Sequence, residues 1–232
     1  MLFPEPPVCS EAMDVAFLVD ASGSVGAANF DKQKEFVKAV ASTLGLRSGL
    51  ARAGSLVYSD MATVQQSFNG YNGTHSVMEA VDHIPYYGRT TRIDRALSVA
   101  NTDLFSANGG VRSYVANTLL LLTDGRQTPA PDSISMERAV KPLKDKKVAR
   151  IALGIGNRIS PSELRRVVDG DDDVVTVDSF DDLLSSMYLV SKKLCARAGK
   201  YVSPDIKTPK TTSHFFFISL ACSALFRRSL VS

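Results

Sequence analysis

The stretch FLVDASGSVG, residues 17–26, carries the first sign of how this chain folds. An apolar run ends in the carboxylate of Asp20, and two hydroxyls then follow at Ser22 and Ser24. In an extended turn, side chains two residues apart point the same way, and Gly23 between them lets the backbone curl around a small ion. Alternatively, Ser24 or Asp20 caps the helix that follows. Taken alone, the stretch favours a cap or a turn.

A second acid ends another apolar run, NTLLLLTD at residues 117–124, where the last residue is Asp124. In an open parallel sheet, ligands bind beyond the carboxyl ends of the strands, at the point where the strand order reverses. If the two strands are neighbours, Asp20 and Asp124 converge on one crevice with both serines, and the cap becomes the weaker interpretation. Carboxylate and hydroxyl oxygens without imidazole or thiolate suit Mg²⁺ or Mn²⁺, and suit Ca²⁺ less well.

Apolar runs alternate with amphipathic segments from residue 13 to about 195. This pattern predicts an α/β fold with a doubly wound, mostly parallel six-stranded sheet and helices on both faces. The expected strands are 13–20, 54–60, 63–68, 117–124, 148–155 and 174–177. The third alternates in polarity and follows the second closely, so we expect a hairpin with an antiparallel edge strand. The expected helices are 28–44, 75–84, 92–105, 131–146, 160–168 and 181–195.

Length and composition indicate one domain with tails, because 232 residues at 44% hydrophobic content can bury one sizeable core. We expect an N-terminal lead at 1–11, the domain at 12–195, and a basic tail with a short apolar segment at 196–232. The net charge is +3. The tail carries a basic excess, so the domain itself is slightly acidic, and a basic face for nucleic acid is not indicated.

Neither end of the chain carries a clear targeting signal. Residues 1–12 contain acids and prolines where a signal peptide needs a basic start and an apolar core. The apolar run at 215–226 is too short to span a bilayer. A lipid-anchor signal is an alternative that its polar ending RRSLVS disfavours. The missing signal peptide favours either an incomplete N-terminus or an intracellular role.

Enzyme, nucleotide and zinc sites are disfavoured, and we expect no catalytic residue. Gly154 and Gly156 lack a third glycine at the dinucleotide spacing, and neither GxxxxGK[ST] nor GxSxG occurs. The three cysteines and three histidines show no zinc-ligand spacing. The acidic run at 169–173 lacks the downstream glutamate of an EF-hand, so we expect a solvated loop. Asp20 or Asp124 as a nucleophile is the remaining enzymatic alternative.

Three segments resemble those that build the metal-ion-dependent adhesion site of a von Willebrand factor type A domain. They are DVAFLVDASGSVGAANFDKQKEFVKAV at 14–40, YGRTTRIDRAL at 87–97 and NTLLLLTDGRQ at 117–127. The resemblance covers roughly residues 12–195, with the segments in the right order at the right separations. The subtype looks closest to the matrilin and collagen-associated A domains of extracellular matrix, of an invertebrate kind. A Rossmann-like fold is therefore implied.

The resemblance implies five metal ligands: Asp20, Ser22, Ser24, Thr91 and Asp124. The serines would bind through their hydroxyls, and the two acids mainly through water. Counting back from Ala96 by the usual step selects Thr91 as the threonine, with Thr90 as the second choice. The family often has another threonine two positions later, where this chain has Ile93. That departure affects hydrogen bonds around the ligands and removes none of them.

The resemblance also implies a disulfide bond between Cys9, just before the first strand, and Cys195, at the end of the last helix. The alternative is two free or buried thiols, and Cys222 is left over in either case. Asn72 begins the only N-glycosylation sequon, in a position where a surface loop is expected. Such triplets are common by chance, so the sequon adds little support for secretion.

The implied function is a secreted, non-enzymatic adhesion or matrix-assembly module. A carboxylate of a protein ligand, such as collagen or another matrix protein, would complete the coordination of the metal, with no nucleic acid or nucleotide involved. One alternative is a structural component of a mineralised or collagenous matrix whose A domain needs no metal. A third hypothesis is an intracellular scaffold, which the missing signal peptide favours.

Overall fold

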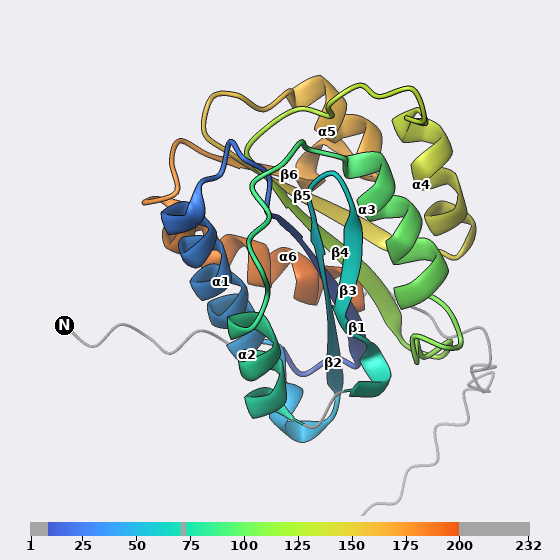
Figure 1. The fold of residues 1–232 in the computed structure, drawn as a ribbon. Helices are drawn as coiled ribbons and strands as arrows, with labels where there is room; N and C mark the ends of the chain where they lie inside the picture. The colour runs from blue at the N-terminus through green and yellow to red at the C-terminus, as the bar shows by residue number, and fades with distance from the viewer. Residues whose placement is uncertain (1–8, 71–72, 200–232) are drawn as a thin grey trace, which may run out of the picture.

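The computed structural model describes residues 9–70 and 73–199, and its centre is a six-stranded sheet (Figure 1). Asn72, Cys222, the segment at 215–226 and nearly all of the predicted tail lie outside the described residues. The strands are β1 Met13–Asp20, β2 Ala51–Tyr58, β3 Ala62–Gln66, β4 Ala116–Thr123, β5 Ala149–Ile155 and β6 Val174–Val177. The order is β3-β2-β1-β4-β5-β6, and only β3 runs antiparallel to its neighbour. The predicted fold class is confirmed.

Helices cover both faces of this sheet (Figure 1). They are α1 Ala27–Ser42, α2 Thr74–Asp82, α3 Ile93–Val99, α4 Met136–Asp145, α5 Pro161–Val167 and α6 Met187–Gly199. Alternate side chains of β1 point to opposite faces, as the pleat requires. Val15 and Phe17 join the apolar cluster under α1, α2 and α6, while Ala16 and Leu18 join the cluster under α3, α4 and α5.

Strand β1 lies between β2 and β4, and it is parallel to both. The chain adds β2 and β3 on one side of β1 and then crosses to add β4, β5 and β6 on the other. The strand order therefore reverses between β1 and β4, and the loops at their carboxyl ends form the crevice where such sheets bind ligands. Asp20 ends β1 and Asp124 follows β4, so the predicted neighbours do meet at this point.

Two helices begin well after the predicted residue, because local hydrogen bonds decide where they start. The helix predicted from residue 131 begins only at Met136, since Ser135 caps it by accepting a bond from the Arg138 amide. The last helix was predicted from residue 181, yet Leu183–Ser186 is a 3₁₀ turn and α6 starts at Met187. Asp182 accepts a bond of 2.6 Å from the Ser179 hydroxyl, which closes a turn ahead of the helix. Helix α6 also continues past residue 195, the predicted end of the domain.

Helix α6 is fixed to the start of the fold by a disulfide bond between Cys9 and Cys195, whose Cα atoms lie 5.6 Å apart. Helix α6 is also linked to the residue before β6, because Arg197 forms an ion pair with Asp173. Asp173 is buried, so the prediction of a solvated loop at 169–173 is wrong for this residue. None of the helices in the described ranges is long and apolar enough to cross a membrane.

Candidate metal-binding site

The predicted carboxylates and serines meet beyond the carboxyl ends of β1 and β4. Asp20 is fully buried, and its Oδ1 accepts a hydrogen bond of 2.9 Å from the Ser22 amide. The hydroxyls of Ser22 and Ser24 lie 3.2 Å apart. Ser24 then donates a bond of 2.7 Å to Oδ1 of Asp124. A continuous row of oxygen atoms therefore joins the end of one strand to the loop after its neighbour.

The loop before α3 lies beside the loop after β1, as the green and blue segments in Figure 1 show. The Gly23 amide donates a bond of 2.7 Å to the Arg89 carbonyl, and the Gly88 amide donates one of 2.8 Å to the Ala21 carbonyl. A Cβ atom on Gly23 would stand 3.0 Å from the Gly88 carbonyl oxygen, so a larger residue would push the two loops apart. Glycine is needed here for close backbone approach.

The contact between the loop after β1 and the loop before α3 places Thr91 next to the row of oxygens. A Cβ atom built on Gly125 would lie 3.7 Å from both the Ser24 Oγ and the Thr91 Oγ1, so the two hydroxyls border the same point. Thr91 is buried, whereas Thr90 is exposed. Thr128 fixes the Thr91 backbone, because its amide donates a bond of 2.8 Å to the Thr91 carbonyl and its hydroxyl accepts one from the Thr91 amide.

The helix-cap alternative for Ser24 and Asp20 is wrong. The residue that caps α1 is Gly26, with φ at 73°, and no side chain bonds to the free amides of the first turn. The side chains of Asp20 and Ser24 instead belong to the row of oxygen atoms described above. Ile93, where a threonine was expected from the resemblance, is fully buried in the apolar cluster under α3.

Sequence reasoning missed two hydroxyls that contact Asp20 from behind. Thr123 donates a bond of 2.8 Å to the second carboxylate oxygen of Asp20. The Tyr58 hydroxyl lies 3.4 Å from the same oxygen and donates a shorter bond of 2.8 Å to the Leu122 carbonyl. The sequence offered one signal for these contacts. Tyr58 and Thr123 are the last residues of β2 and β4, the two strands that flank β1, so their side chains lie at the same edge of the sheet as Asp20.

The charges of the site differ from those elsewhere in the core. Five aspartates are buried in the described residues. Three of them have an arginine partner: Asp14 with Arg112, Asp94 with Arg92, and Asp173 with Arg197. Asp20 and Asp124 are the other two, and within the described part of the chain neither forms an ion pair.

Burial raises the pKa values of both carboxyls. Burial raises the pKa of Asp20 from 3.8 to about 6, against the hydrogen bonds from Ser22 and Thr123, and the Asp124 carboxylate raises it further. Burial also raises the pKa of Asp124, while the hydrogen bond from Ser24 and the positive charge of Arg158 lower it. Two adjacent buried carboxylates are costly when ionised unless a cation neutralises them.

The donor set fits a hard divalent cation. It consists of two carboxylates and the hydroxyls of Ser22, Ser24 and Thr91, which are the oxygen ligands that Mg²⁺ and Mn²⁺ prefer. Across the ranges 9–70 and 73–199, no three His, Cys, Asp or Glu side chains gather as a metal-binding group. The hydroxyls are therefore an essential part of any metal site at this position.

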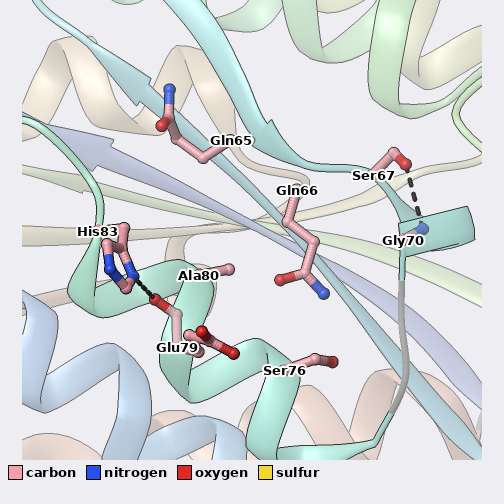
Figure 2. A pocket seen from close by; sticks show the side chains of 8 residues that line it. All are labelled: Gln65, Gln66, Ser67, Gly70, Ser76, Glu79, Ala80 and His83. Atoms are coloured by element: carbon pink, nitrogen blue, oxygen red, sulfur yellow. Dashed lines mark hydrogen bonds between the residues drawn. The ribbon is translucent and has the colours of Figure 1, made fainter.

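A separate pocket of about 380 Å³ lies between β3 and α2, away from these residues (Figure 2). Figure 2 shows Gln66 at the end of β3 pointing toward α2, with Glu79 on that helix and His83 just after its last residue. The Gln66 amide nitrogen is buried without a hydrogen-bond partner in the described residues. None of the predicted metal ligands lines this pocket.

Solved structures share the fold. The structure of proximal thread matrix protein 1 from the mussel byssus matches with a TM-score of 0.76 and 23% identity, covering 81% of this chain and 48% of that one. Another structure of the same protein, described as having a zinc-occupied MIDAS motif, matches with a TM-score of 0.75 and 22% identity. At this level of identity, the likeness shows the fold alone.

Relatives occur among much longer proteins. Integrin alpha-X of Mus musculus is 29% identical over 192 residues, which is 80% of this chain and 16% of the integrin. The collagen alpha-5(VI) chain of Mus musculus is 29% identical over 198 residues, or 82% of this chain and 7% of the collagen. Matrilin-1 of Homo sapiens is 29% identical over 158 residues, or 68% of this chain and 31% of the matrilin.

The chain therefore spans less than a third of the length of these relatives. The family model of the von Willebrand factor type A domain matches residues 14–188, which is most of the chain and includes Asp20 and all of β4. The chain belongs to the von Willebrand factor type A domain family.

Proposed function

We propose that this chain is an extracellular, non-enzymatic adhesion or matrix-assembly module that binds a protein ligand through a divalent cation. The observation that carries the proposal is the pair of buried carboxylates, Asp20 and Asp124, neither of which forms an ion pair within the described residues. A fold that pairs its other buried aspartates with arginine leaves these two for a cation from outside the chain.

The residues that would hold the cation are Asp20, Ser22, Ser24, Thr91 and Asp124. The metal would be Mg²⁺ or Mn²⁺, because the set contains only oxygen donors, and Ca²⁺ suits it less well. When bound, the cation offers an open coordination position to a carboxylate of the partner. Thr123 orients Asp20 through its hydrogen bond, and Thr128 holds the Thr91 backbone.

A place outside the cell is supported by two observations. The relatives described above carry the names of a collagen, a matrilin and an integrin. The bond between Cys9 and Cys195 suits an oxidising compartment, which counts against an intracellular scaffold. Collagen or another matrix protein that presents an aspartate or glutamate is the kind of partner we infer.

Binding to immobilised collagen and other acidic matrix proteins tests this function. Wild-type protein should bind in the presence of Mg²⁺ and lose its partner when EDTA is added. The Ser22→Ala/Ser24→Ala variant should fail to bind in both conditions, while Ser42→Ala, on the exposed side of α1, serves as the matched control. Binding that persists in EDTA would instead support a structural matrix component whose domain works without metal.

A further inference from the structure

Two exposed arginines border the candidate metal site without an acidic partner. Arg126 follows Asp124 in the loop after β4, and Arg158 lies in the loop after β5. Neither forms an ion pair with any residue in the described ranges. Arg89, at the same edge of the sheet, differs because it pairs with Asp60 at 3.3 Å. Positive charge therefore remains uncompensated in the loops after β4 and β5.

The fold places both arginines beside the row of oxygens. Strands β4 and β5 are parallel neighbours, with Thr123 opposite Gly154, so the loops after them leave the same edge of the sheet. Gly125, next to Arg126, adjoins the hydroxyls of Ser24 and Thr91. Arg158 follows soon after Ile155, the last residue of β5.

A pocket of about 370 Å³ continues outward from this point, between the N-terminal ends of α4 and α5. Arg126 lines it together with Ser135, Ser160 and Arg166. Its single acid, Glu163, accepts a bond of 3.0 Å from the Gln127 amide. Arg166 lies 3.7 Å from Glu137, so Arg126 is the arginine of this pocket that lacks an acid.

We propose that the partner segment carries more than one acidic side chain, and that Arg126 and Arg158 bind a second carboxylate while the first occupies the metal site. This inference rests on the proposed function of the metal site. It narrows the partner to a protein segment with clustered aspartates or glutamates, because arginine recognises carboxylates by charge and by paired hydrogen bonds. A solitary acidic residue would use the metal site alone.

Two fluorescein-labelled peptides test the proposal by fluorescence polarisation in Mg²⁺. One contains a single aspartate among glycine and serine residues, and the other contains four adjacent aspartates. The four-aspartate peptide should bind wild-type protein about tenfold or more tightly, which is the gain expected from two solvent-accessible charge pairs. In Arg126→Gln/Arg158→Gln, this preference should fall to at most about fourfold, the statistical advantage of four carboxylates over one, while the affinity for the single-aspartate peptide stays within about twofold. Arg47→Gln/Lys192→Gln removes the same charge from exposed positions elsewhere and should keep the preference.

The outcomes separate this proposal from the function on which it rests. A preference that survives in Arg126→Gln/Arg158→Gln overturns the proposal, and so does an equal loss of affinity for both peptides. Failure of wild-type protein to bind either peptide overturns it as well. Binding that depends on the arginines but persists unchanged in EDTA supports the arginine contact and refutes the metal site. If the protein bound a heparin oligosaccharide and neither peptide, the proposal would be overturned, and the partner would be a sulfated glycan instead of an acidic protein segment.

Discussion

Asp14 and Asp20 lie near opposite ends of β1, and both are completely buried, yet their surroundings differ in one respect. Arg112 surrounds Asp14, donating bonds of 2.7 Å from its amide and 2.8 Å from its Nε to the two carboxylate oxygens. Asp20 receives bonds only from neutral groups, which are the Ser22 amide and the Thr123 hydroxyl at the shortest distances. The acid at the start of β1 is therefore neutralised by an arginine of the same chain, and the acid at its end has no such partner.

We propose that this difference separates a structural carboxylate, Asp14, from a functional one, Asp20. A buried ion pair within the chain is complete in the folded state, and removing one partner leaves an uncompensated charge. A buried carboxylate that has only neutral partners stores an unfavourable charge, which a bound cation can neutralise. The local sequence distinguishes the two acids only in part: Ser22 and Ser24 follow Asp20 and mark it as a candidate ligand. Nothing near Asp14 indicates its ion pair, because its partner Arg112 is far away in the chain.

The largest expected effect comes from removing the cation at the structural end. Arg112→Met should lower the free energy of unfolding by about 3–5 kcal/mol, because Asp14 would remain buried without a partner. Urea denaturation followed by circular dichroism measures this change. Arg47→Met, at an exposed position, should stay within about 0.5 kcal/mol of wild type. A loss equally small in Arg112→Met would mean that Asp14 does not depend on its arginine.

A smaller effect should appear at the functional end as the pH changes. The pKa of Asp20 is raised from 3.8 to about 6, so the folded protein holds this proton more tightly than the unfolded chain does. Its contribution to stability is full below about pH 4 and is lost as the pH rises through about 6. In a metal-free buffer, the free energy of unfolding should therefore carry an Asp20 contribution that declines by roughly 2–3 kcal/mol between pH 4 and 7.

The variant Asp20→Asn isolates that contribution, since asparagine does not titrate. Urea denaturation across the same pH range, with a chelator present, should show a flatter profile for the variant than for wild type. Parallel profiles would show that Asp20 is not the carboxyl whose charge the fold opposes.

The smallest expected effect concerns the two adjacent threonines. Thr91→Ala should weaken Mg²⁺ binding by about tenfold, or about 1.4 kcal/mol, because it removes a buried hydroxyl beside Ser24. Thr91→Ser keeps the hydroxyl and should recover most of the affinity. Thr90→Ala should bind as wild type does, because Thr90 is exposed. A larger loss in Thr90→Ala than in Thr91→Ala, measured by competition with a fluorescent metal indicator, would reverse the assignment.

Most strands were predictable from sequence because they are short apolar runs, and β1 and β4 are buried on both faces. The edge strand β3 was predictable because its residues alternate in polarity. The meeting of Asp20 and Asp124 was also predictable, since both acids follow the most apolar strands and parallel strands align their carboxyl ends. The boundaries of α4 and α6 were not, because side-chain bonds of Ser135 and Ser179 decide where those elements begin.

Contacts between distant segments were the other part that sequence did not predict. Thr123 and Tyr58 reach Asp20 only because β4 and β2 flank β1 in the sheet. The buried Asp173 was expected to be solvated, and its partner Arg197 lies on another element, α6. Pairings of this kind follow from topology, which a local pattern of polar and apolar residues does not specify.

Isothermal titration of Mg²⁺ into metal-free protein tests the central claim most directly. Wild-type protein and Arg47→Met, whose site is unchanged, should each bind one Mg²⁺ per chain. Asp20→Asn should remain folded by circular dichroism and give no binding heat above dilution, because one of the two uncompensated carboxylates has been removed. Equal affinity in Asp20→Asn and wild type would contradict the claim that the buried acids at the carboxyl ends of β1 and β4 await a cation.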